Sequence, residues 1–318
     1  MWNKCFITVL IIVLSACTDK QVDKVKIGTN IWPGYEPLFV VQQKHPKFND
    51  TIRFVEYRNA SQVLNGIINN SIDVAAVTLD EAVKIKALGY DIEVIWLVDE
   101  SFGADALISK HYDSIEALKG KKIAVETSAL GAYFFSRLVS INNFNKLDFK
   151  VVNLEVNRHF DALNSGAVDA VLTFEPVKSK LVAKDAQILF DSKQIPGEII
   201  DVLVVNNNQF NELKEKELVS FLSAFHKTVT AINQDISPYF SSLNRRLNLT
   251  ESQFKQTYQE VRLFDLEANQ VWFKDMPFQN ALIERYANVL QQEGITKEVC
   301  QCKHLINSKY VELVANER

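Results

Sequence analysis

Two aromatic side chains, Trp32 and Tyr35, lie on either side of the Pro33-Gly34 dipeptide, just after a short apolar segment. Indole and phenol rings stack on flat ligands and attract ammonium groups, and each ring carries a polar atom that can be anchored. Rings of this kind also cap hydrophobic cores. The pair therefore indicates either one wall of a ligand-binding site or the edge of a core.

Carboxylates and hydroxyls follow several of the apolar segments that we interpret as strands. A carboxylate that accepts a hydrogen bond from a ligand N–H gives a site direction and specificity. These loops contain no Arg or Lys, which disfavours a doubly charged anion, although backbone N–H groups of residues 127–131 could hold one negative group. The pattern favours a small organic amine or an aminated heterocycle. The candidate ligand-binding residues are Trp32, Tyr35, Thr78, Asp80, Asp105, Thr127, Ser128, Glu175 and Asp201.

Each acidic candidate also has a structural alternative. An acidic side chain just after a strand can cap the following helix or be solvated, and for Asp80, at the start of a predicted helix, both roles are equally open. Capping explains Asp105, Glu175 and Asp201 less easily.

Motifs for covalent or cofactor chemistry are missing from the sequence. The closest two glycines are Gly28 and Gly34, so neither the dinucleotide-binding fingerprint nor the phosphate-binding P-loop is present. The histidines are scattered without the spacing of metal ligands. We expect no catalytic residue, no cofactor and no metal.

Alternating strands and helices must position the candidate residues. The first part of the chain predicts the order βαβαβαβ, and repeated crossovers of this kind imply a largely parallel sheet. Loops beyond the carboxyl ends of such strands are where ligands bind. Strands are predicted over 25–29, 51–57, 73–77 and 92–98, with helices that begin near Glu36, Ala60 and Glu81.

A second α/β unit follows the irregular segment 101–105, which we interpret as the crossing into a second domain. Its residues predict a strand, a helix and another strand, and the apolar strand 199–205 is interpreted as the return crossing. Helices dominate from residue 207 onward, one of them opened by a capping box at Thr250–Gln253. The predicted elements of the second unit cover 122–125, 133–141 and 149–154.

Two segments, 72–80 and 168–175, resemble each other, because each predicts a buried strand that ends in Thr, an apolar residue and a carboxylate. An amphipathic helix precedes each segment, so we expect two similar units whose strand ends face each other. Chance similarity between two such units is the alternative.

The N-terminus has the features of an export signal. Lys4 precedes the apolar run Cys5–Leu14, which is too short for a typical membrane span. The tetrapeptide Leu14-Ser15-Ala16-Cys17 resembles the lipobox of bacterial lipoproteins. The resemblance implies a signal peptide over 1–16, acylation of Cys17 and a tether over 17–24. A plain membrane anchor or an ordinary secretory signal is the alternative.

Cys300 and Cys302 then remain for redox or metal chemistry. Two thiolates without a matching His or Cys pair supply too few ligands for a metal site. Free or partly buried thiols and a local disulfide both remain open.

Length and composition indicate a globular protein of about two domains. The 318-residue chain is 47% hydrophobic and 23% charged, which excludes disordered and collagen-like classes. The net charge is -4, so no basic surplus is available to neutralise phosphates, and we expect no nucleic-acid partner.

Several short motifs together resemble those of periplasmic-binding-protein type II receptors, in the group that serves nitrate, taurine, alkanesulfonate and thiamine-pyrimidine importers. The resemblance covers roughly residues 24–205. The chain departs from the group at Asn70-Ser71, where a glycine is common, and in the glycine-poor loop 126–131. The motifs are Ile27-Gly28 with Pro33-Gly34-Tyr35, Ile72–Ala75, Leu118–Val125, and Gly166–Ala170 with Glu175-Pro176.

The resemblance implies an α/β fold of two lobes with mainly parallel sheets flanked by helices. It places lobe 1 at 25–105 and 201–318, lobe 2 at 106–200, and a hinge at the two crossings. The implied function is that of a monomeric, non-enzymatic, lipid-anchored binding protein in the periplasm that delivers a small molecule to an ABC permease. A receptor that signals to a membrane kinase or cyclase is the alternative, and an enzyme like the fungal pyrimidine synthase of this fold is a third.

Overall fold

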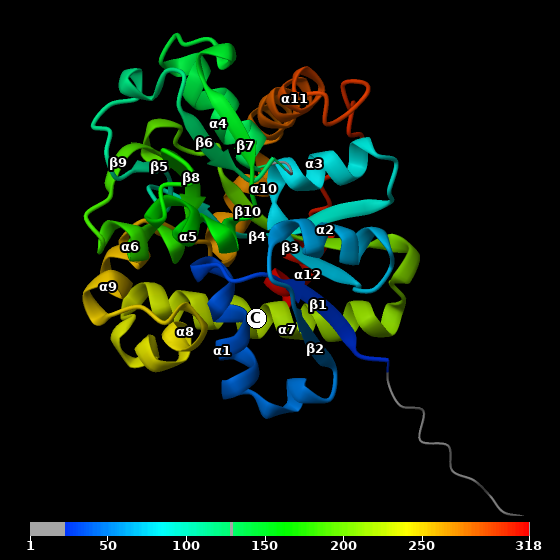
Figure 1. The fold of residues 1–318 in the computed structure, drawn as a ribbon. Helices are drawn as coiled ribbons and strands as arrows, with labels where there is room; N and C mark the ends of the chain where they lie inside the picture. The colour runs from blue at the N-terminus through cyan, green and yellow to red at the C-terminus, as the bar shows by residue number, and fades with distance from the viewer. Residues whose placement is uncertain (1–22, 128–129, 318) are drawn as a thin grey trace, which may run out of the picture.

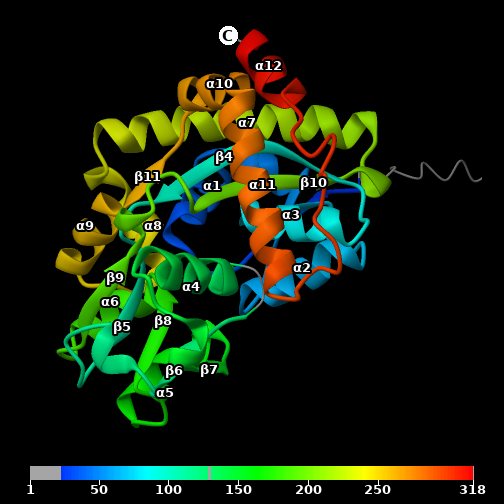
Figure 2. The same ribbon diagram turned by 90° about the horizontal axis from the view of Figure 1, so that it is seen from above.

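The computed structural model describes residues 23–127 and 130–317. These residues form two β-sheets covered by helices (Figure 1), and a perpendicular view separates the layers (Figure 2). The α/β class predicted from the sequence is confirmed. The predicted signal peptide, Cys17 and Ser128 lie outside the described residues.

The larger sheet has the strand order β11-β4-β10-β3-β1-β2. Strand β1 pairs in parallel with β2 and β3, whereas β10 runs antiparallel to β3 and β4, and β11 antiparallel to β4. Every residue of β3 and β10 is buried, as expected for strands covered on both faces. The strands are β1 (Val25–Thr29), β2 (Ile52–Glu56), β3 (Val74–Thr78), β4 (Ile92–Ser101), β10 (Ile200–Asn206) and β11 (Val261–Leu263).

The smaller sheet has the order β7-β6-β8-β5-β9. Strands β7, β6 and β8 are parallel, and β5 runs antiparallel to both β8 and β9. The strands are β5 (Asp105–Ser109), β6 (Lys122–Val125), β7 (Lys150–Asn153), β8 (Ala170–Phe174) and β9 (Gln187–Asp191).

Strand direction follows from the connections. Where an α-helix returns the chain, the next strand runs parallel, as from β1 to β2 and from β6 to β7. Strand β4 instead continues into β5 through residues 102–104, and β9 reaches β10 through residues 192–199, with no α-helix between. Most strands in each sheet still point one way, but the hydrogen-bonded pairs around β5 and β10 are antiparallel.

Helices cover both faces of each sheet. Helices α2 and α3 pack on one face of the larger sheet, and α7 and α12 on the other (Figure 2). On the smaller sheet, α4 packs against β6 and β8, and α5 and α6 lie across from it. The helices are α1 (Glu36–Lys44), α2 (Ala60–Ile68), α3 (Leu79–Ala87), α4 (Leu130–Ile141), α5 (His159–Asn164), α6 (Val177–Val182), α7 (Glu212–Gln234), α8 (Phe240–Leu247), α9 (Glu251–Gln259), α10 (Leu266–Lys274), α11 (Met276–Gln292) and α12 (Lys309–Asn316).

Local signals explain where several helices begin and end. The predicted capping box opens α9, where the Thr250 N–H donates to Gln253 Oε1 at 2.9 Å and the Gln253 N–H to Thr250 Oγ1 at 3.3 Å. Helix α11 is followed closely by Gly294, whose φ of +70° favours glycine. Cys300 and Cys302 form a disulfide in the segment before α12. Of the two alternatives left open by the sequence, the local disulfide is therefore the one observed.

The hydrophobic core has one large cluster around the six-stranded sheet and one smaller cluster on each face of the five-stranded sheet. Tyr133 of α4 packs into the large cluster rather than against its own sheet, so α4 contacts both halves of the molecule. Among the described residues, none of the helices combines the length and the hydropathy needed to span a bilayer.

Candidate ligand-binding site

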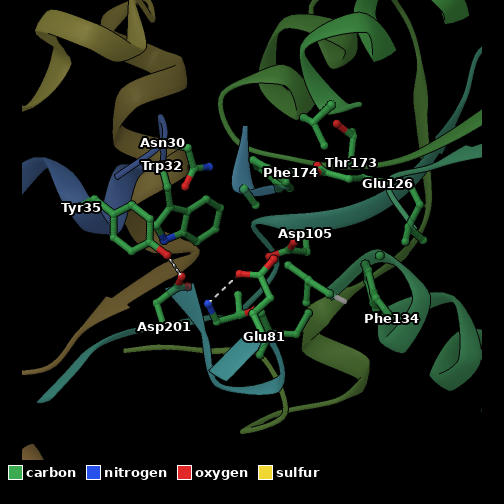
Figure 3. Close-up of a pocket in the computed structure, with 17 residues that line it drawn as sticks. Asn30, Trp32, Tyr35, Glu81, Asp105, Glu126, Phe134, Thr173, Phe174 and Asp201 are labelled. Carbon is green, nitrogen blue, oxygen red and sulfur yellow. Dashed lines mark hydrogen bonds between the residues drawn. The ribbon is translucent and has the colours of Figure 1, made fainter. Parts of the chain in front are cut away.

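A cavity lies between the two sheets, where the strand ends of both converge (Figure 3). Its empty volume, including the opening to solvent, is about 590 Å³. The lining comes from both sheets and from α2, α3 and α4. The lining residues are Asn30, Trp32, Tyr35, Ala60, Thr78, Glu81, Asp105, Glu126, Leu130, Gly131, Phe134, Val156, Leu172, Thr173, Phe174, Ile199 and Asp201.

Strand register sets three polar side chains in a row at one edge of the larger sheet. Asp201 on β10 lies opposite Thr78, the last residue of β3, and opposite Asp99 on β4. Directly opposed residues of paired strands point to the same face. Asp99 and Asp201 are both buried, so the two carboxyl groups lie close together away from solvent.

These two carboxyl groups hold the aromatic rings. The indole Nε1–H of Trp32 donates to both oxygens of Asp99, at 3.0 and 3.2 Å, and the Tyr35 hydroxyl donates to Asp201 (Figure 3). A Cβ atom at Gly34 would lie 1.8 Å from Asp99 Oδ2. Only glycine at this position lets the turn η1 (Pro33–Tyr35) approach the carboxylate so closely.

Trp32 and Tyr35 combine the two roles that the sequence left open. Both belong to the large hydrophobic core cluster, and both line the cavity. The Trp32 ring also meets Phe174 of β8 edge to face, with ring centroids 5.9 Å apart. One wall of the cavity therefore contains an aromatic contact between the loop after β1 and strand β8.

Burial favours the neutral form of the carboxyl groups of the cavity. It raises the pKa of Asp105 to about 7 and that of Glu126 to about 8, and nearby acidic residues add to both shifts. The pKa of Asp201 is raised well above its ordinary value by burial and by Asp99. Desolvation disfavours the charged form of each acid, and neighbouring negative charges act in the same direction.

Glu81 and Glu126 bring acidic groups to the cavity from its two sides. Glu81 Oε2 accepts from the Thr78 N–H at 3.1 Å at the start of α3, and burial raises the Glu81 pKa. Glu126 follows β6 and accepts from the Ser61 hydroxyl of α2 at 3.3 Å, across the cavity.

The structure brings five of the predicted ligand-binding residues together in the cavity lining. Ser128 lies outside the described residues, and the remaining three do not line the cavity. The five are Trp32, Tyr35, Thr78, Asp105 and Asp201.

The three residues outside the lining have local partners. Glu175 accepts from the N–H and the hydroxyl of Ser179 at 3.1 and 2.8 Å and lies 3.5 Å from the Lys178 amine. Asp80 is buried in the first turn of α3, and the Thr127 N–H donates to Asn153 Oδ1 at 3.2 Å. Glu175 thus accepts from a backbone N–H in the first turn of α6, as a capping acid does. At the start of α3 that role belongs to Glu81, and Asp80 Oδ2 has no hydrogen-bond partner among the described residues.

Several lining residues escaped the prediction, chiefly apolar ones from β8 and α4. Thr173 could have been found, because the similarity of segments 72–80 and 168–175 makes it the counterpart of Thr78, and both threonines line the cavity. Glu81 carried no signal, since an acidic residue in the first turn of a helix is ordinary.

No group of three or more His, Cys, Asp and Glu side chains within residues 23–127 and 130–317 is arranged to hold a metal ion. The acidic groups of the cavity therefore lack the geometry of a cation cage in the part of the chain that the structure describes.

Two mixed α/β sheets joined by two crossings, with a cavity between them, are the architecture of periplasmic binding proteins. The alkanesulfonate-binding protein of Xanthomonas axonopodis pv. citri, solved with MOPS, matches with a TM-score of 0.75 at 14% identity over 90% of this chain and 98% of that chain. The periplasmic aliphatic sulphonate binding protein of Escherichia coli matches with a TM-score of 0.71 at 15% identity, over 90% and 92%. At identities this low, the two matches show that the fold is shared and nothing further.

Sequence comparison defines the family. The family model described as NMT1/THI5 like matches residues 49–235, more than half of the chain, and the chain belongs to this family. The "Putative aliphatic sulfonates-binding protein" of Bacillus subtilis is 25% identical over an alignment of 224 residues that covers 66% of this chain and 65% of that protein. This chain thus spans slightly less than two thirds of that relative. The resemblance to type II binding proteins is confirmed, and these relatives are binding proteins rather than enzymes.

Proposed function

We propose that this protein is a solute-binding protein that captures a small organic amine, such as an aminated heterocycle, between its sheets and delivers it to an ABC permease. The observation that carries the proposal is the composition of the cavity. Four carboxyl side chains and four aromatic rings line it, and its described lining contains no Lys or Arg. Carboxyl groups accept from a ligand N–H, a cationic ligand favours their ionised form, and the rings stack on a flat ligand.

Sulfonate is the solute in the names of the relatives, and it is the competing ligand class. A sulfonate needs N–H or O–H donors, and cationic donors serve it best. The donors in the described lining are the neutral groups of Asn30, Thr78 and Thr173 and the backbone N–H groups at the start of α4. Trp32 already donates to Asp99. None of these donors carries a positive charge, so the described lining offers a sulfonate no cationic partner.

Capture by closure of two lobes is the mechanism we propose. Lobe 1 comprises residues 25–105 and 201–318, lobe 2 comprises 106–200, and the hinge lies at the crossings near Asp105 and Asp201. Contacts between the lobes surround the cavity in this structure, including the Trp32–Phe174 ring pair and the Ser61–Glu126 hydrogen bond. A ligand that bridges both lobes favours the closed form because it contacts both walls only there.

Location and partner are part of the same proposal. We infer a monomer held at the extracytoplasmic face of a bacterial membrane, in the periplasm, by acylation at Cys17. The closed form docks on the permease, and no nucleic acid is involved. The relatives named as periplasmic proteins support this placement. The alternative function is a receptor whose closed form engages a membrane kinase or cyclase.

Thermal melts with a solute panel test the ligand class. Amines, aminopyrimidines, sulfonates and nitrate are added separately to the mature chain. A true ligand at 100 times its dissociation constant stabilises the protein by about 2.7 kcal/mol. We expect the shift with an amine or aminopyrimidine. A shift with sulfonates or nitrate alone would show that the amine proposal is wrong.

Uptake of the labelled ligand separates transport from signalling. Cells that lack this chain should lose uptake at low ligand concentration, and the full chain should restore it. Unchanged uptake together with a lost transcriptional or second-messenger response would favour the sensory alternative.

A further inference from the structure

Asp105 occupies the point where the chain enters the smaller sheet. It is the first residue of β5 and lies opposite Phe174 of β8 in the strand register. Its backbone N–H donates to the Ser101 hydroxyl at 3.1 Å. The residue is 3% exposed and its side chain lines the cavity, so Asp105 lies at a crossing and faces the cavity (Figure 3).

The other carboxyl groups of the lining already accept hydrogen bonds from the protein. Asp201 accepts from the Tyr35 hydroxyl, Glu81 from a backbone N–H and Glu126 from a serine hydroxyl. The Asp105 carboxyl group interacts with the Ser101 side chain, but its Oδ2 is buried and has no hydrogen-bond partner among the described residues. A buried polar atom left without a partner costs free energy, so native proteins rarely leave one unless a ligand or water completes it.

The charged groups around Asp105 leave it short of positive charge. Lys178 is the cation that acts on it, while Glu175, Glu81, Asp99 and Asp201 act as negative neighbours. Lys178 is itself engaged, since it forms a buried ion pair with Glu260 and lies 3.5 Å from Glu175. Burial raises the pKa of Asp105 to about 7, which is consistent with a carboxyl group whose cationic neighbour, Lys178, is engaged by other acids.

We propose that Asp105 is the specificity-determining anchor of the site, whose free Oδ2 accepts an N–H from a planar cationic group such as an amidinium or a protonated aminopyrimidine. The proposal rests on the proposed function, that the cavity binds an amine-bearing solute. Phe174 lies opposite Asp105 and packs on Trp32, so a ring whose N–H meets Asp105 lies beside both aromatic side chains. The carboxylate selects the charge of the ligand, and the rings select its flatness.

A charge series on one ring tests the anchor. Benzamidine, benzamide and benzenesulfonate are planar and similar in size, but they are cationic, neutral and anionic. Calorimetric titrations at pH 8, above the Asp105 pKa of about 7, give the dissociation constant of each probe for the natural protein and for Asp105→Asn. A hydrogen bond to a charged group corresponds to a preference of about 10- to 100-fold for benzamidine over benzamide. Asp105→Asn should reduce that preference to about threefold or less.

Asp191→Asn is the matched control. Asp191 ends β9, which pairs with β5, and it lies outside the cavity lining. The same substitution there should leave the benzamidine preference unchanged. Thermal melts of the ligand-free proteins complete the design. We expect Asp105→Asn to melt at or above the temperature of the natural protein, because an amide replaces an unpaired buried acid.

The outcomes distinguish this inference from the proposed function. A preference of the natural protein for benzenesulfonate, or no binding of any probe, overturns the planar amine as the ligand class and the anchor with it. A preference for benzamidine that persists in Asp105→Asn leaves the proposed function standing and overturns the role of Asp105 alone.

Discussion

At the scale of single residues, Trp32 shows how one side chain serves both the fold and the site. Its indole N–H is held by Asp99, its ring packs with the core, and the ring also lines the cavity. Because the ring is anchored before a ligand arrives, little side-chain entropy is lost on binding. Asp99 stays outside the lining but fixes the orientation of a residue within it.

Two alanine substitutions test two different roles: Trp32→Ala tests a ligand contact, and Glu175→Ala tests an acid that stabilises the fold. We expect Trp32→Ala to weaken ligand binding by about 1–3 kcal/mol, because a cavity wall is lost. Glu175→Ala should leave affinity within about threefold but lower the free energy of unfolding, since it leaves Ser179 and the buried Lys178 with fewer partners. Calorimetric titration and urea unfolding measure the two effects.

Trp272→Ala is the control for Trp32→Ala, because Trp272 is a mostly buried tryptophan outside the cavity lining. A normal affinity for Trp32→Ala, or a large affinity loss for Glu175→Ala at unchanged stability, would contradict these assignments.

The sequence predicted polar lining residues at strand ends more reliably than apolar lining residues between the two sheets. Thr78, Asp105 and Asp201, predicted as ligand contacts, line the cavity, because the carboxyl ends and crossings of strands in open sheets border such cavities. Phe134 and Leu172 were missed, because whether an apolar residue faces a cavity or a core depends on how two sheets are placed, and hydrophobic periodicity is the same in both cases.

At the scale of elements, the order of strands and helices followed from periodicity and capping, but the antiparallel pairing of β5 and β10 did not. Buried strands of either direction have the same apolar composition. Their direction depends on connections that lack a helix, at residues 102–104 and 192–199. These same two connections carry the proposed hinge.

Helix α11 supplies a contact between the proposed lobes that can be tested. Arg285 of α11 donates to Glu198 Oε1 at 2.5 Å, and Arg137 of α4 donates to the same carboxylate at 2.6 and 3.0 Å. Arg285→Ala removes the lobe 1 partner and favours the open form. Because Arg285 is 45% exposed, we expect only about two- to fivefold weaker ligand binding.

Small-angle X-ray scattering supplies the second measurement for Arg285→Ala. The ligand-free variant should have a larger radius of gyration than the natural protein, and saturation with ligand should remove the difference. Lys255→Ala, which breaks an exposed pair with Glu251 within α9, is the control. Equal affinity and equal ligand-free dimensions for Arg285→Ala and the control would contradict a closing role for this contact.

At the scale of the whole molecule, buried acids make stability depend on pH. Burial raises the pKa of each to between about 7 and about 8, above the values of unfolded chains. The folded state then holds more protons than the unfolded state, so the stability from these groups is full at low pH and is lost as pH rises through the folded pKa values. The groups are Glu36, Asp80, Asp99, Asp105 and Glu126.

We therefore expect the melting temperature of the ligand-free protein to fall by at least about 5 °C between pH 5 and pH 8. Burial lowers the pKa of His159 to about 4, so its contribution to stability is lost as pH falls and opposes the trend at the acid end. Calorimetric melts across this range measure the slope, and the double variant Asp105→Asn with Glu126→Gln should flatten it. A melting temperature that rises steadily to pH 8 would contradict the assignment of neutral, buried acids.

The charge of the captured solute decides between an amine and a sulfonate ligand, and native mass spectrometry identifies that solute most directly. The mature chain is incubated with an extract of the source organism, desalted, and analysed intact, and the bound compound is then released and identified. We predict one molecule per chain, bearing a basic amine on or beside a flat ring. A sulfonate or another anion as the bound compound would contradict the account.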